Sequence, residues 1–203
     1  MRVDDQQKRL IRMIGFSLLV IIVVLGIIYI TSIRSSQSMP ERFIEARKNA
    51  ALVSEDIVRL TNNTNEKVAK INVLEIKGRG EEALALIQGA RASNDAAYGK
   101  AFELSQNLKA LAESLAEIKS TKEQRIAYEA VAVELSLVSE FISYTQILNT
   151  FLSNLTALIL DNTIQNQNTV RASISAVNEK TAIINNLNKQ FIERMSVFDS
   201  SFQ

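Results

Sequence analysis

Carboxylates, lysines, tyrosines and hydroxyl side chains are the groups with which this 203-residue chain could do acid–base or nucleophilic chemistry, because it contains no His and no Cys. An imidazole base, a thiolate nucleophile and a zinc–thiolate site are therefore excluded. The adjacent carboxylates Glu55-Asp56 and Glu81-Glu82 diverge by about 100° on a helix, so neither pair forms a site. Glu113 and Glu117 share a helix face, but Lys109 lies beside them, as is typical of a solvated, charged surface.

Other binding chemistry also lacks its usual residues. A ferritin-like di-iron site needs Glu-x-x-His pairs, which a chain without His cannot supply. Gly78-Arg79-Gly80 follows a predicted helix rather than a strand, unlike a phosphate-binding loop. The formal net charge of +1 predicts no surface for nucleic acid. We therefore expect no enzyme, no cofactor, no metal site and no nucleic-acid partner, and we identify no small-molecule substrate.

An uncharged stretch near the N-terminus has the length and composition of a membrane span. Residues 13–33 contain 16 apolar residues among 21 and no charged one. At about 1.5 Å per residue they cover about 31 Å, close to a hydrocarbon core of about 30 Å. Basic residues are concentrated before the stretch, which predicts a cytoplasmic N-terminus and binding to membrane lipid through the span. The expected order is a cytoplasmic segment, a signal anchor, a linker and a periplasmic or extracellular domain, at 1–12, 13–33, 34–39 and 40–203.

Two kinds of N-terminal processing are alternatives to an uncleaved anchor. A cleavable signal peptide has a shorter apolar stretch that ends in small residues, and this chain lacks both features. From Lys8 to Ile30 the chain also resembles type IV pilins, with a basic leader, Gly15, and Phe16 at the start of a long apolar helix. That resemblance implies a filament subunit processed between Gly15 and Phe16. The chain departs from the family at Val20, where pilins usually have Glu.

Beyond the linker the sequence predicts an all-α domain of four helices with nearly equal lengths. Pro40 suits a first helical turn, and Gly78 and Gly80 suit a helix end and the following connection. The Asn-rich stretch 161–168 favours another turn, although one continuous bent helix remains open there. Similar lengths and short connections indicate an antiparallel four-helix bundle, with a dimer of longer hairpins as the alternative. The expected helices cover 40–77, 80–119, 122–160 and 163–202.

Apolar residues in these segments recur at the alternating three- and four-residue spacing of a coiled coil. The longest such stripe runs through 80–119 from Ala83 to Ile118. In 40–77 the pattern slips after Thr64, and in 122–160, where the stripe is assigned to Ile126, Ala130, Val133 and Leu137, it slips before Phe141. Both slips predict stutters, which locally unwind a supercoil.

Two polar residues, Asn94 and Asn188, fall on the apolar stripes. A buried Asn commonly fixes the register and pairing of helices. The alternative is that either residue lines a polar pocket that binds a small ligand between helices.

The topology places further candidate contacts at the two ends of the bundle. The turns at 78–80 and 161–168 should lie at the tip far from the membrane, where Asn162, Gln165, Asn166 and Asn168 could contact a partner or simply face solvent. Phe198 and Phe202 should return to the membrane-proximal end. They could complete the core there or contact the bilayer or another subunit.

These features favour a single-pass membrane protein that acts by protein–protein contact, as a scaffold, a spacer or an accessory subunit of a membrane complex, or by self-association. Twelve residues before the anchor are too few for a cytoplasmic enzyme or output domain. The order of anchor and bundle also resembles the extracytoplasmic part of chemoreceptors and sensor kinases. That resemblance, which is architectural, implies a ligand-sensing module; this chain is expected to lack an output domain of its own, so a partner would carry the signal.

Overall fold

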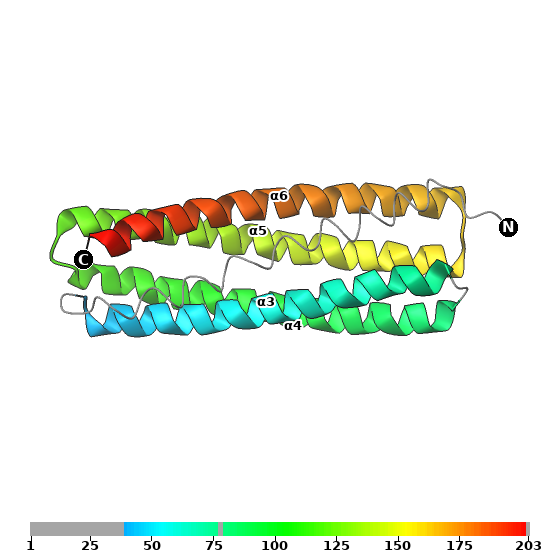
Figure 1. The fold of residues 1–203 in the computed structure, drawn as a ribbon, viewed down its shortest axis with the longest axis horizontal. Helices are drawn as coiled ribbons and strands as arrows, with labels where there is room; N and C mark the ends of the chain where they lie inside the picture. Colours follow the sequence, from blue (N-terminus) through cyan, green and yellow to red (C-terminus); the bar gives the residue numbers. More distant parts are fainter. Residues whose placement is uncertain (1–38, 77–78, 202–203) are drawn as a thin grey trace.

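The computed structural model describes residues 39–76 and 79–201, which form a bundle of four long helices (Figure 1). The described chain is all-α, as predicted, and each helix begins within one residue of its predicted start. The predicted segments 1–12 and 13–33, most of the linker 34–39, the Gly15-Phe16 pair and Phe202 lie outside the described residues. The elements are α3 (Glu41–Ile76), α4 (Gly80–Ser114), a short 3-10 helix η2 (Leu115–Glu117), α5 (Thr121–Leu160) and α6 (Ile164–Ser200).

Successive helices run in opposite directions, so the bundle is antiparallel (Figure 1). The α3–α4 and α5–α6 connections lie at one end, and the α4–α5 connection lies at the other end with the last turn of α6. Because α5 ends at Leu160 and α6 starts at Ile164, the two segments are separate helices rather than one bent helix. The backbones of α3 and α4, and of α5 and α6, approach most closely, whereas those of α3 and α6 lie farther apart.

The predicted stripe of α4 forms one side of the core, and every one of its members is buried. Its first half is built from Ala83, Ala90, Ala97 and Ala101, whose small side chains allow α3 to pack closely against it. Its second half contains Leu104, Leu108, Leu111 and Leu115, which occupy more volume. The side chains that this stripe contributes to the core are therefore small in its first half and larger in its second half.

The two predicted stutters are wrong. In α3 the buried positions continue through Thr61 and Thr64 to Val68 in unbroken steps of four, three and four residues. In α5 the buried positions are Ala127, Ala130, Glu134, Leu137 and Phe141, again without a slip. Ile126 and Val133, which the sequence analysis placed in the stripe, are only partly buried. The error has one cause, since polar side chains occupy repeat positions that we expected to be apolar.

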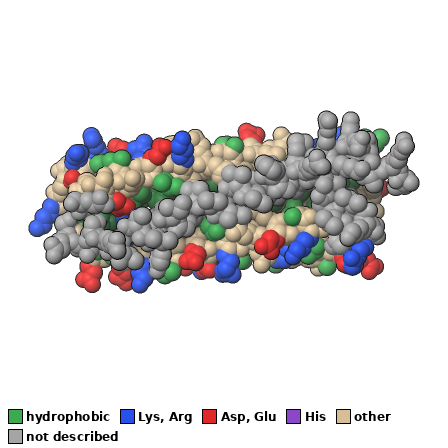
Figure 2. Space-filling model, in the orientation of Figure 1, with side chains coloured by type: hydrophobic (Ala, Val, Ile, Leu, Met, Phe, Trp, Pro, Cys, Tyr) green, Lys and Arg blue, Asp and Glu red, His purple; other side chains and the backbone are tan. Residues whose placement is uncertain are grey.

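The surface of the bundle carries charged side chains of both signs. Figure 2 shows Lys and Arg side chains interspersed with Asp and Glu along the visible face, without a large area of one sign. None of the helices within residues 39–76 and 79–201 combines the length and hydropathy that a membrane crossing requires. The span predicted at 13–33 is outside those ranges.

Phe198 makes the last large contribution to the core, because its ring is fully buried and its centroid lies 5.4 Å from that of Phe43. We expect Phe198→Ala to lower the free energy of unfolding by about 3–5 kcal/mol, through lost burial and the cavity left behind. Urea denaturation followed by circular dichroism measures this change. The matched control is Phe102→Ala at an exposed position of α4, which should change stability by less than about 0.5 kcal/mol. Equal effects of the two substitutions would contradict the assignment of Phe198 to the core.

Candidate functional site

A small cavity lies in the middle of the bundle and is lined by side chains from all four helices. Its volume is about 30 Å³, which is room for one or two water-sized molecules. The lining residues that are partly exposed, Val58 and Asn185, lie on α3 and α6, two helices whose backbones are not closely packed. The apolar part of its lining comes from Ile57, Leu104, Leu137, Phe141, Ile184 and Phe191.

Three buried polar side chains, each from a different helix, interrupt this apolar lining. Thr61 of α3, Glu134 of α5 and Asn188 of α6 all line the cavity, and each is more than nine-tenths buried. Within the described part of the chain, Thr61 Oγ1 and Asn188 Oδ1 have no hydrogen-bond partner. A buried polar atom without a partner costs about 1–3 kcal/mol, so a concentration of such atoms around one cavity points to a binding role.

Glu134 is 7% exposed and forms no hydrogen bond or ion pair among the described residues. Burial in this apolar setting raises the pKa of its carboxyl group to about 7, and the positive charge of Arg47 opposes the shift. No Lys or Arg lines the cavity. The carboxyl group therefore changes its charge near neutral pH without a cationic partner beside it.

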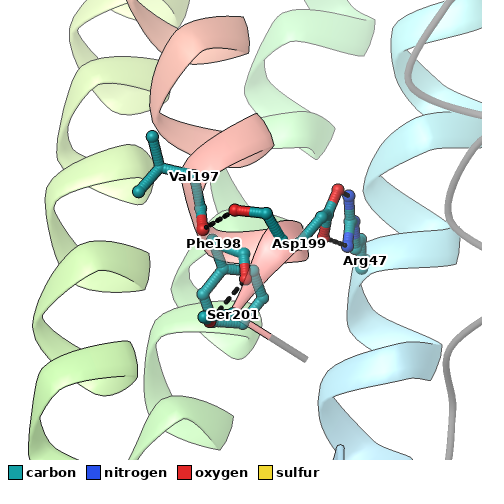
Figure 3. Close-up of polar contacts among 6 residues, drawn as sticks. Arg47, Val197, Phe198, Asp199 and Ser201 are labelled. Atoms are coloured by element: carbon teal, nitrogen blue, oxygen red, sulfur yellow. Dashed lines mark hydrogen bonds and ion pairs between the residues drawn. The ribbon is translucent and has the colours of Figure 1, made fainter. Parts of the chain in front are cut away.

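Arg47 is already committed to Asp199 at the end of the bundle where the chain finishes (Figure 3). Its Nη1 and Nη2 donate to the two carboxylate oxygens at 2.7 and 2.8 Å, a bidentate geometry that is strong and directional. This ion pair connects α3 to α6, and the Phe43–Phe198 ring contact connects the same two helices. The two contacts hold α3 and α6 together between the cavity and the end of the bundle where α6 finishes, although the backbones of these helices are not closely packed.

The two asparagines predicted on the stripes have different environments. Asn94 is buried, and its Nδ2 donates to the backbone oxygen of Thr145 at 2.7 Å, which ties α4 to α5. It does not line the cavity. Asn188 lines the cavity with its Oδ1 unpaired. Of the two, Asn188 is the one placed to contact a ligand.

The tip residues predicted as partner contacts are mostly used within the connection itself. Asn166 Nδ2 donates to the backbone oxygens of Ala157 at 3.2 Å and Asp161 at 2.6 Å. The side chain of Thr163 accepts from the backbone N–H of Asn166 and caps α6. Asn162 Oδ1 accepts from Gln167 Nε2 at 2.9 Å. These bonds give the three-residue connection a defined shape.

Gln165 and Asn168 are exposed on the first turns of α6, and their role as partner contacts stays a prediction. The same holds for the membrane-proximal contact predicted for Phe198 and Phe202. The ring of Phe198 lies inside the core rather than on the surface. Among the described residues, no group of Asp and Glu side chains is arranged to hold a metal ion.

Comparison of the chain with protein-family models, with curated proteins and with solved structures gives no match.

Sequence reasoning missed Thr61 and Glu134 as site residues. Both are polar, and each directly follows an apolar residue, Leu60 or Val133, that fits an apolar stripe locally. The signal that could have identified them is the heptad phase, since an unbroken repeat from Ala130 to Phe141 requires position 134 in the core. An apparent stutter at a charged residue can therefore indicate a buried charge.

The raised pKa of Glu134 predicts a stability difference that depends on pH. Between pH 4.5, its ordinary pKa, and pH 7 the folded chain keeps this proton while the unfolded chain releases it, so stability falls as pH rises. We expect Glu134→Gln to be more stable than the wild type by up to about 3 kcal/mol at pH 8, with almost no advantage at pH 4, below both pKa values. Urea denaturation at both pH values measures the difference. Glu140→Gln on the same helix, at a partly exposed ion pair with Lys180, is the control, and an advantage for Glu134→Gln that is equal at both pH values would be inconsistent with the buried carboxyl group.

The amides at the tip allow a matched comparison between two asparagines. Asn166→Ala removes both side-chain hydrogen bonds across the connection and should lower the free energy of unfolding by about 1 kcal/mol. Asn168→Ala changes an exposed residue and should have an effect within about 0.5 kcal/mol. Thermal unfolding followed by circular dichroism compares the two variants. If Asn168→Ala is the more destabilising, the hydrogen-bonded connection is not what orders the tip.

Proposed function

We propose that this chain is a membrane-anchored helical bundle that acts by contact with a partner protein at its tip. The observation that carries the proposal is the exposure of Leu160 and Ile164, which are 71% and 76% accessible and are the most exposed large apolar residues within 39–71 and 79–201. They flank the α5–α6 connection, one at the end of each helix. Exposed apolar side chains on a rigid support are typical of contact sites.

The surroundings of this apolar pair support a protein contact. The connection between them is ordered by Thr163 and Asn166, so little conformational entropy would be lost on binding. Asn162, Gln165 and Asn168 are exposed around the pair. An apolar centre with a polar rim is the usual composition of a protein interface.

The bundle would hold this tip away from the membrane. The helices contain 35 to 40 residues, which corresponds to about 55 Å at about 1.5 Å per residue. The start of α3, which follows the predicted anchor and linker, lies at the opposite end of the bundle (Figure 1). In this proposal the chain is a rigid spacer that presents a contact surface outside the cytoplasm.

Ligand sensing is a second candidate, because the central cavity contains unpaired buried polar groups that a plain spacer would not need. A ligand there would contact three of the four helices and could change how α3 lies against α6. The two candidates concern different parts of the molecule, and one chain could do both.

The proposed contact can be tested by crosslinking in cells. A photoreactive phenylalanine analogue at Ile164 should crosslink to a specific protein, whereas the same analogue at Ile183, an exposed position on the middle of α6, should not. Leu160→Ser should reduce the crosslink from position 164 at least fivefold without changing the Tm of the bundle. Crosslinks of equal yield and identity from positions 164 and 183, or none from 164, would contradict the proposal.

A further inference from the structure

We infer that the central cavity binds a small ammonium-type cation, either methylammonium or the ammonium ion itself, through the oxygen atoms of Thr61, Glu134 and Asn188. This site is separate from the proposed contact at the tip, and neither inference depends on the other.

The polar atoms of the cavity favour a ligand that donates hydrogen bonds. Asn188 Oδ1 is an acceptor only, the Glu134 carboxylate is an acceptor only when ionised, and Thr61 Oγ1 can accept. An R–NH₃⁺ group has three N–H donors, which matches three oxygen acceptors from three helices. Two of these oxygens have no partner within the described chain, so a ligand would satisfy atoms that are otherwise buried at a cost.

The charge of the site selects a monovalent cation. Glu134 is the one ionisable residue of the lining, and no cationic side chain lines the cavity, so an anion would meet a carboxylate and no counter-charge. Calcium and magnesium need six or more oxygen ligands or several retained waters, which one carboxylate in a space of about 30 Å³ cannot provide. Phe141 and Phe191 complete the wall, and aromatic rings attract cations.

The size of the cavity limits the substituent on nitrogen. A volume of about 30 Å³ admits an ammonium or methylammonium ion, whereas a longer amine would have to displace the packed side chains of the wall. Val58 of α3 and Asn185 of α6 line the cavity and are partly exposed, so the loosely packed α3–α6 pair offers a route from solvent. Binding would connect α3, α5 and α6 through one ion.

The charged groups around Glu134 determine how binding should depend on pH. From α3, Arg47 acts on Glu134 at a distance while it remains paired to Asp199. The lining residues contributed by α4 and α6 include no titratable group. Since only the ionised carboxylate attracts an ammonium ion, the affinity should rise about tenfold per pH unit up to pH 7 and level off above it.

The test is thermal unfolding of the purified full-length chain in detergent, with methylammonium chloride added at pH 8. We expect the Tm to rise with methylammonium concentration beyond the effect of equal sodium chloride, and the effect to be lost at pH 5. Acetamide, which is of similar size but carries no charge, should not raise the Tm. Equal shifts with sodium chloride or acetamide would overturn the inference and leave a cavity that holds only water.

Variants assign the binding to this cavity. Glu134→Gln keeps the size of the side chain and should weaken methylammonium binding at least tenfold, measured from the concentration dependence of Tm. Glu140→Gln removes the same charge from the same helix outside the cavity and should leave the affinity within twofold of the wild type. Unchanged affinity in Glu134→Gln would overturn the inference. If Glu134→Gln fails to fold, the pH dependence and the acetamide comparison on the wild-type chain still decide it.

Discussion

Each helix carries a stripe of residues that recurs with a seven-residue repeat, and burial of these four stripes is the constraint on which the rest of this structure depends. The chain has no Cys and therefore no disulfide, and only 6% of its residues are aromatic. Four long helices can then be held together mainly by the side chains that repeat along their shared faces. The steps of three and four residues keep each stripe facing the bundle axis over its whole length. Polar residues at repeat positions, such as Thr61, Glu134 and Asn188, are therefore buried together with the apolar ones.

This constraint explains why polar residues are buried in the middle of the bundle. Asn94 has a partner there, because its amide donates to the backbone of α5, and the backbones of α4 and α5 pack more closely than those of α3 and α6. Thr61 and Asn188 lie on α3 and α6, whose backbones are farther apart, and they did not. The difference between a polar residue that stabilises pairing and one that lines a cavity is therefore the spacing between neighbouring helices.

The two ends of the bundle are closed in different ways. At the end where α6 finishes, the Arg47–Asp199 ion pair and the Phe43–Phe198 ring contact connect α3 and α6 directly. At the tip, side-chain amides and a capping threonine satisfy backbone groups of the α5–α6 connection and leave Leu160 and Ile164 exposed. Side-chain contacts therefore join two helices at the first end, whereas hydrogen bonds order an exposed connection at the second.

The sequence by itself determined the helical class, the four segments and the antiparallel order, because apolar periodicity and helix-ending residues are local properties of the chain. It also identified Asn188 as a buried polar position. Only the tertiary structure decided that Thr61 and Glu134 belong to the core, since their polarity argued locally for the surface while the phase of the whole helix buried them. The pKa of Glu134 near neutrality and the pairing of Arg47 with Asp199 depend on residues far apart in the sequence. Such properties follow from which helices become neighbours and how closely they pack, and no local pattern contains that information.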